Sequence, residues 1–153
     1  MLQRIQTIYL LIIAALAIAM LFLPLAVLQA DGQLLKFDAT GISTMTTPPE
    51  LIYPTWGLFA LTAVVALLAL ITIFLYKRRI LQMRLCVFNA VLMLGIYGMF
   101  AFFAWTFKGE LKEIQTTLRI ALAFPAISLI LEYLAIRNIG ADEALVRSLD
   151  RLR

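Results

Sequence analysis

Four long apolar runs, separated by shorter polar segments, dominate the pattern of side chains along the chain. The runs cover residues 7–28, 56–76, 85–107 and 118–136. A helix needs about 20 apolar residues to cross the hydrocarbon core of a bilayer, and its backbone groups must be paired within the segment. The pattern therefore predicts an all-α membrane protein in which a domain over residues 1–139 forms a bundle of four transmembrane helices.

The loop predicted over residues 29–55, between the first two runs, has the pattern of a small β-hairpin. Asp31-Gly32 is a typical two-residue turn, and residues 34–41 then alternate between apolar and polar side chains. Such alternation is typical of a strand with one buried face. The apolar members are Leu35, Phe37 and Ala39. We expect the hairpin on the extracytoplasmic side, where it either binds a partner or covers the ends of the helices.

The basic residues are unevenly divided between the two sides of such a bundle. Nine fall on one side, namely Arg4, Lys77, Arg78, Arg79, Arg84, Arg137, Arg147, Arg151 and Arg153. Four fall on the other side, namely Lys36, Lys108, Lys112 and Arg119. Because cytoplasmic loops of membrane proteins carry the excess of Lys and Arg, both termini are predicted to be cytoplasmic.

The first run begins like a secretory signal, with Arg4 before an apolar stretch. Signal cleavage requires two small residues in an A-x-A pattern. The residues before Asp31 place Leu28 at one of these positions. We therefore expect the first run to be retained as a membrane helix.

The last segment, residues 140–153, reads "GADEALVRSLDRLR" and predicts a separate amphipathic helix. Gly140 is expected to end the fourth membrane helix, and Glu143 can pair with Arg147 one turn later. The residues expected to make surface contacts are Leu145, Arg147, Leu149, Arg151, Leu152 and Arg153. Two interpretations stay open: the leucines and arginines lie on an anionic membrane surface, or they bind a partner.

One ionisable side chain, Glu132, falls inside a predicted membrane helix, nearer the cytoplasmic face than the centre. Ionisable residues in such helices are costly unless they are paired. If the third and fourth helices form an antiparallel hairpin, Asn89 lies at the height of Glu132, and Arg84 lies one to two turns nearer the cytoplasm. We predict a polar contact among these residues. It is either structural or part of proton or ligand handling.

Composition limits the chemistry that the chain can perform. It has no histidine and a single cysteine, Cys86, so His-based catalysis and His/Cys metal clusters are excluded. No phosphate-binding glycine loop is present. The net charge of +4 is explained by membrane orientation rather than by nucleic acid. Pro125 in the fourth run predicts a kink.

These observations lead to two functional hypotheses. The first is a non-enzymatic accessory, scaffold or assembly subunit of a membrane complex, without cofactor or metal, whose partners are the lipid bilayer and a membrane protein or further copies of itself. The alternative is a small transporter or a lipid- or quinone-binding protein that uses Glu132.

The segments "MLQRIQTIYLLI" and "DEALVRSLDRLR" at the two ends of the chain resemble the bacterial family known as domain of unknown function 4293. Members of this family have similar lengths and four predicted spans, and they come from Gram-negative bacteria. The resemblance implies a multi-pass protein of the inner membrane. It implies no activity, substrate or catalytic residue.

Overall fold

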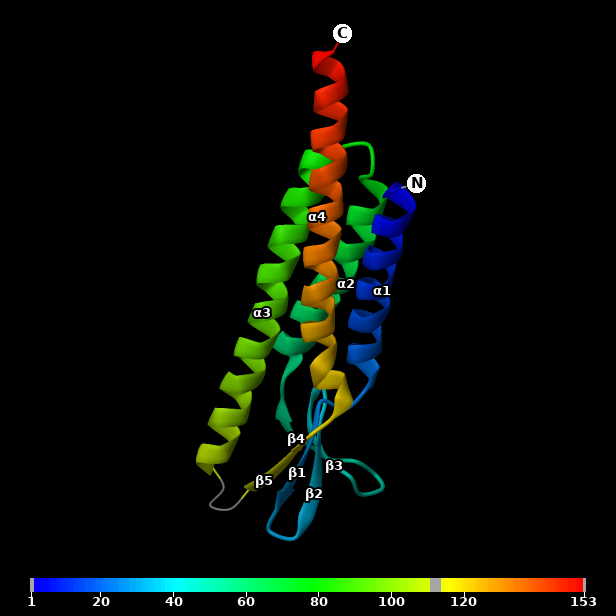
Figure 1. Cartoon of the computed structure of the whole chain (residues 1–153). Coiled ribbons are helices and arrows are strands. Elements are labelled where there is room, and N and C mark those ends of the chain that lie inside the picture. Colours follow the sequence, from blue (N-terminus) through cyan, green and yellow to red (C-terminus); the bar gives the residue numbers. More distant parts are fainter. Residues whose placement is uncertain (1, 111–113, 153) are drawn as a thin grey trace.

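The computed structural model of the chain describes residues 2–110 and 114–152. Its helices lie side by side along one axis (Figure 1). They are α1 (Leu2–Phe22), α2 (Trp56–Phe74), α3 (Arg79–Glu110), the short 3-10 helix η1 (Ile120–Ala123) and α4 (Phe124–Arg151). Within the described residues, α1, α2, α3 and the segment formed by η1 and α4 are long and apolar enough to cross a membrane.

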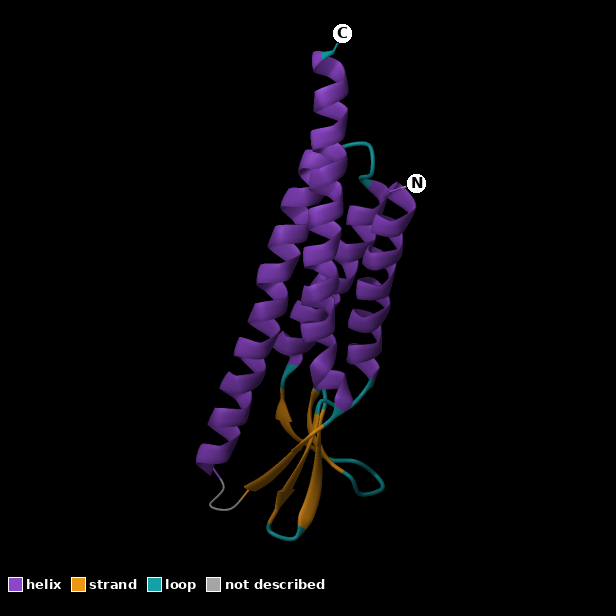
Figure 2. Cartoon of the chain, viewed as in Figure 1, coloured by secondary structure: helices purple, strands orange, loops and turns teal. Residues whose placement is uncertain are grey.

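The four long helices form a closed bundle. Both α1 and α3 pack against α2 and α4, and apolar side chains such as Leu10, Ile13, Met93 and Ile96 fill the interior. Both termini and the connection between α2 and α3 lie at one end of the bundle, and a β-sheet lies at the other end (Figures 1 and 2). We call these the terminal end and the sheet end.

The prediction of an all-α fold is wrong, because five strands form an antiparallel sheet at the sheet end (Figure 2). The strands are β1 (Ala26–Ala30), β2 (Gln33–Phe37), β3 (Gly41–Thr44), β4 (Leu51–Pro54) and β5 (Ile114–Leu118). Their order in the sheet is β4-β3-β2-β1-β5. The strands that are neighbours in sequence are therefore also neighbours in space, except for β5.

Strand β1 lies partly inside the range predicted for the first membrane helix, since α1 ends at Phe22 rather than at residue 28. Proline lacks an N–H and disfavours helical backbone at the residue before it, and α1 stops before Pro24. The apolar side chains of Leu25 and Leu28 are buried beside and within the sheet. A short apolar run is compatible with either a buried strand or a helix. The predicted range of the first helix was therefore too long at its C-terminal end.

The turn between β1 and β2 has the sequence Asp31-Gly32, with φ angles of 50° and 77°. These positive angles are those of the tight hairpin turn that this dipeptide favours. Leu35, Phe37 and Ala39 are buried, as the alternation predicted. The prediction of a small hairpin confined to the first loop is nevertheless wrong. The sheet begins before that loop, continues through β3 and β4, and takes its last strand from elsewhere in the chain.

That last strand, β5, comes from the segment between α3 and α4. It pairs antiparallel with β1, and Thr116 lies opposite Leu28. Threonine favours strands because of its branched Cβ, but the sequence "IQTTL" shows no clear alternation. The fourth helix was expected from residue 118, where the structure has the end of β5, and α4 instead begins at Phe124 after η1.

Helix α3 is longer than a membrane crossing requires, and its excess length supports the sheet. Its 32 residues span about 48 Å, whereas a hydrocarbon core is about 30 Å thick. The C-terminal part of α3 extends to the level of the sheet (Figure 1). There the rings of Phe37 and Phe100 lie 4.9 Å apart, and those of Tyr53 and Phe103 lie 6.0 Å apart, both edge to face. These contacts attach the sheet to the bundle.

The expected kink at Pro125 is also wrong, because this residue lies in the first turn of α4. Proline is well tolerated there, since the first N–H groups of a helix have no partner within the helix. The Tyr97 hydroxyl completes the junction with η1. It donates to the Leu122 carbonyl at 2.8 Å and accepts from the Ala126 N–H at 2.9 Å.

Gly140 does not end the fourth helix. Helix α4 continues through it to Arg151, so the separate tail helix predicted over residues 140–153 is instead the last part of α4. Ile139 and Asp142 on either side of Gly140 are buried against the rest of the bundle. Tertiary packing of this kind outweighs the weak helix propensity of a single glycine.

Candidate functional sites

The structure brings together two of the three residues predicted to form a polar contact. The Asn89 side chain on α3 donates from Nδ2 to Oε2 of Glu132 on α4, at 3.2 Å. Each of these residues is only 1% exposed. The antiparallel arrangement of α3 and α4 thus places Asn89 and Glu132 at the same height, as their positions in the sequence indicated.

The contact leaves hydrogen-bonding capacity unused. Among the described residues, Oε1 of Glu132 and Oδ1 of Asn89 are buried without a well-formed hydrogen bond. The thiol of Cys86, one turn before Asn89, faces the same carboxyl group as a weak donor. Each of these two oxygens can accept a further hydrogen bond. The group can therefore hold a proton or a hydrogen-bond donor.

This polar contact lies about halfway along the bundle. Gln82 donates from Nε2 to the Thr72 carbonyl at 3.1 Å, which places these residues at one height on α3 and α2. Because the two helices run in opposite directions, Asn89 is level with Val65, the tenth of the 19 residues of α2. The contact is thus level with the middle of α2.

Arg84 does not join Asn89 and Glu132. Its side chain is exposed and lines an open hollow at the terminal end of the bundle. The buried face of α3 is formed by Gln82, Cys86 and Asn89, at helical spacing. Arg84 is two residues from Gln82 and from Cys86, about 200° around the helix from each. Arg84 therefore lies at the predicted height along α3 but on the other side of the helix.

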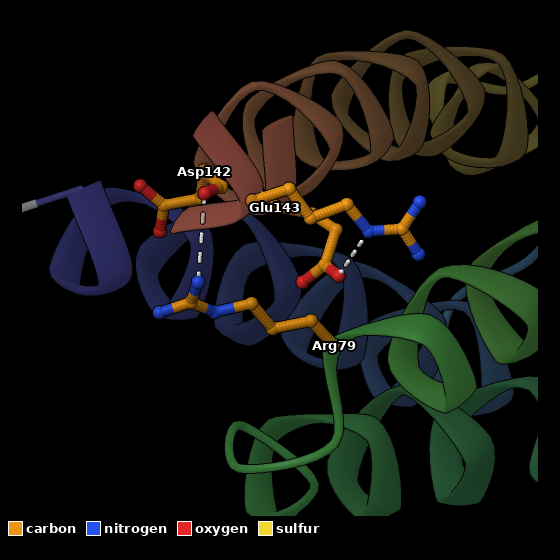
Figure 3. A network of polar contacts seen from close by, with 4 residues as sticks. Arg79, Asp142 and Glu143 are labelled. Atoms are coloured by element: carbon orange, nitrogen blue, oxygen red, sulfur yellow. Dashed lines mark hydrogen bonds and ion pairs between the residues drawn. The ribbon is translucent and has the colours of Figure 1, made fainter. Parts of the chain in front are cut away.

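A second polar layer, which the sequence analysis missed, lies at the terminal end. Gln6 on α1 donates to Oδ2 of Asp142 at 3.4 Å, and Arg79 donates to the Asp142 carbonyl at 3.5 Å (Figure 3). The Asp142 side chain is buried. Glu132, Ala135, Ile139 and Asp142 follow one another at intervals of three or four residues, so they lie on the same buried face of α4. That spacing was the available signal, but Asp142 was interpreted as the start of a new helix.

Beyond Asp142, α4 projects past the ends of the other helices (Figure 1). The leucines of the predicted stripe, Leu145, Leu149 and Leu152, are 55%, 58% and 84% exposed. Arg147 pairs with Glu143 at 3.0 Å, as their spacing predicted. Arg151 is exposed, and Arg153 lies outside the described residues. The structure thus presents the stripe on a projecting helix end.

The described part of the bundle interior is closely packed. A cavity between Thr62, Ser128 and Pro125 has a volume of only about 10 Å³, which is about the space of one water molecule. Among the described residues, no three His, Cys, Asp or Glu side chains gather closely enough to hold a metal ion. The Asn89–Glu132 contact is therefore a small polar group between well-packed helices.

The described chain has four helices that are long and apolar enough to cross a membrane, and an antiparallel sheet lies at one end of them. This is the pattern of a helical protein with several possible membrane spans. The chain belongs to the family described as a domain of unknown function (DUF4293), which it matches over residues 2–152. This match confirms the resemblance carried by the two terminal segments. No curated protein matches the chain.

Proposed function

We propose that the chain is an integral protein of the bacterial inner membrane, with both termini in the cytoplasm. Each of the four helices exposes large apolar side chains along its length, such as Leu11, Leu67, Val91 and Ile130. Proteins in water rarely expose contiguous apolar surface of this extent. Of the nine basic residues expected on the cytoplasmic side, the eight that the structure describes belong to the chain's terminal segments and to the α2–α3 region, which share the terminal end (Figure 1).

Within the membrane, we propose that the protein acts as a non-enzymatic accessory or assembly subunit that binds a partner protein through the end of α4. The observation that carries this proposal is the exposed stripe of Leu145, Leu149 and Leu152 on a helix that has left the bundle. From Asp142 to Arg151 this helix extends by about 14 Å. A stripe of leucines at spacings of four and three residues fits the groove of another helix.

The direction of α4 favours a protein partner over a membrane surface. An amphipathic helix bound to a membrane lies in the plane of the interface, which would require a sharp turn after the last membrane residues. Helix α4 instead continues without a break through Gly140 and keeps the direction of the bundle (Figure 1). In the proposed orientation its leucines therefore point sideways beyond the end of the bundle.

Photo-crosslinking of the full chain in native membranes tests this proposal. A photoreactive amino acid in place of Leu149 should give one discrete protein adduct, which mass spectrometry identifies as another protein or as a second copy of the chain. The same amino acid in place of Arg151, which lies about 200° around the helix from Leu149, is the matched control and should give little adduct. Adducts with lipid alone at Leu149 would contradict a partner-binding role.

A second candidate function is supported by one oxygen of Glu132 and one of Asn89 that lack a well-formed hydrogen bond, since such a group can hold a proton. A small transporter, or a protein that binds a lipid or quinone, would use this group. The small volume of the described interior cavity favours the structural interpretation instead. Glu132→Gln separates the two, because it removes the titratable proton and keeps the hydrogen-bonding shape. Loss of the cellular phenotype at unchanged protein abundance would favour proton or ligand handling.

A further inference from the structure

An open hollow lies at the terminal end of the bundle, where the connection between α2 and α3 meets the base of the projecting part of α4. Its volume is about 790 Å³, within the range of about 300–1,000 Å³ that is usual for small-molecule sites. Four basic side chains line it, those of Lys77, Arg78, Arg79 and Arg84. The hollow is thus large enough for a polar group of substantial size and strongly positive.

The charges in the hollow have little compensation from the protein. The only carboxylate among the described lining residues is that of Glu143, which is paired with Arg147 at 3.0 Å. None of the four basic side chains takes part in an ion pair within residues 2–110 and 114–152. Like charges held close together repel one another, and a bound anion offsets this repulsion.

Two of the basic groups are held in position. Arg79 donates one N–H to the Asp142 carbonyl at 3.5 Å (Figure 3), and a guanidinium group has four further N–H donors. The ammonium group of Lys77 lies 5.9 Å from the centre of the Tyr76 ring, within the range of a cation–π contact. These contacts fix the basic groups at the hollow and reduce the ordering that binding requires.

The apolar surroundings of the hollow indicate an amphiphilic ligand. Ile80 and Leu81 line it beside the arginines, and the neighbouring side chains of Phe74 and Tyr76 on the α2 side are exposed. A ligand with its anionic group in the hollow could lay hydrocarbon chains along the outer surface of α2 and α3. Basic pockets on the cytoplasmic side of membrane helices are suited to the headgroups of anionic lipids.

We infer that this hollow binds the phosphate headgroup of an anionic phospholipid from the cytoplasmic leaflet. The inference rests on the membrane orientation proposed above, which places the terminal end in the cytoplasm. It concerns a site separate from the leucine stripe of α4, since Leu145, Leu149 and Leu152 are absent from the hollow's described lining. The lipid would also brace the base of α4, because Glu143 and Val146 form part of the wall.

Native mass spectrometry of the full-length protein in a neutral detergent tests the site. Phosphatidylglycerol should bind at one preferred site, and phosphatidylcholine with the same acyl chains should bind much more weakly. The double variant Arg79→Gln/Arg84→Gln should lose at least about tenfold in affinity for phosphatidylglycerol. The matched control Arg119→Gln/Arg137→Gln removes the same charge outside the hollow and should stay within about twofold of the wild type.

Two results would overturn the inference. One is equal binding of phosphatidylglycerol by the two double variants. The other is full competition by inorganic phosphate at matched concentration, which would make the hollow a site for a soluble anion.

A separate measurement distinguishes an error in the proposed membrane placement from an error in the proposed lipid site. Wild type and both variants are reconstituted in phosphatidylcholine vesicles and washed with alkaline carbonate. Retention of all three proteins, without a lipid preference in the wild type, refutes the site alone. Release of the wild type refutes the membrane placement and the lipid site together.

Discussion

The Nδ2 atom of Asn89 lies 3.2 Å from Oε2 of Glu132, and this hydrogen bond joins α3 to α4 about halfway along the bundle. Both partners are buried, and each keeps one oxygen without a well-formed partner. A carboxyl group in apolar surroundings is stable only when it is paired or neutral. The contact therefore contributes to how the two helices face each other.

Glu132→Gln should leave the free energy of unfolding within about 1 kcal/mol of the wild type. The glutamine oxygen accepts from Asn89 as before, and the new N–H group can donate to Oδ1 of Asn89, which has no well-formed partner. Thermal unfolding of the purified protein in detergent, followed by circular dichroism, measures the effect.

Glu132→Leu should destabilise the protein by about 1–3 kcal/mol, because the buried Asn89 amide then has no acceptor. The double variant Asn89→Leu/Glu132→Leu is the control and should recover most of the loss, since no buried polar group remains unpaired. Equal losses from Glu132→Gln and Glu132→Leu would show that the negative charge itself is required.

The predicted contact was correct for the positions of residues along the helix axes. It was wrong for the side of α3 on which one of these residues lies. In two antiparallel helices, the residue numbers and the position of the turn between them predict which residues lie at the same height. Asn89 and Glu132 could be matched in this way. Arg84 lies close enough to Asn89 along α3, but its side chain faces outward. Its direction can be inferred only when the buried residues of α3 are known. Asp142 was missed because acidic residues are common at helix starts, and the pattern there fits either interpretation.

Leu149→Asp should leave thermal stability within about 0.5 kcal/mol of the wild type, as is usual for surface substitutions, and should abolish partner binding. The side chain is 58% exposed and lies beyond the bundle. Ile139→Ala, three turns earlier on the buried face of the same helix, should cost about 2–5 kcal/mol. A large loss of stability in Leu149→Asp would show that the leucine stripe is covered by the protein itself.

Membrane orientation gives a prediction that fusions can measure in living cells. Alkaline phosphatase is active only outside the cytoplasm, so a fusion after Arg153 should be inactive. A fusion at residues 44–47, at the end of β3 and in the exposed segment that follows it, should be active. The opposite pattern would reverse the orientation, and it would place the basic hollow on the extracytoplasmic side.

The pairing of β1 with β5 predicts a specific disulfide. Gln29 and Gln115 are both exposed and lie directly opposite each other, and opposite residues in antiparallel strands have Cα atoms about 4.5–5.5 Å apart. Gln29→Cys/Gln115→Cys should therefore form a disulfide on mild oxidation. Gln29→Cys/Thr116→Cys is the control, since neighbouring side chains of a strand point to opposite faces. Equal crosslinking of both pairs would contradict this register.

The sheet shows why the sequence pattern identified the helices better than the strands. Membrane helices are marked by about 20 consecutive apolar residues, and the range predicted for the second helix agrees with α2 to within two residues. Strand β5 has five residues without a clear alternation. It forms because β1 offers an edge from a distant part of the chain, and no local pattern contains that information.

The pairing of β1 with β5 also determines when the sheet can be completed during protein synthesis. The partners Ala30 and Ile114 are 84 residues apart, and ribosomes add about 5–20 residues per second. The β1 edge is therefore translated about 4–17 s before its neighbour. Unpaired strand edges invite pairing with other chains. During this interval the β1 edge is open to pairing with a strand of another chain.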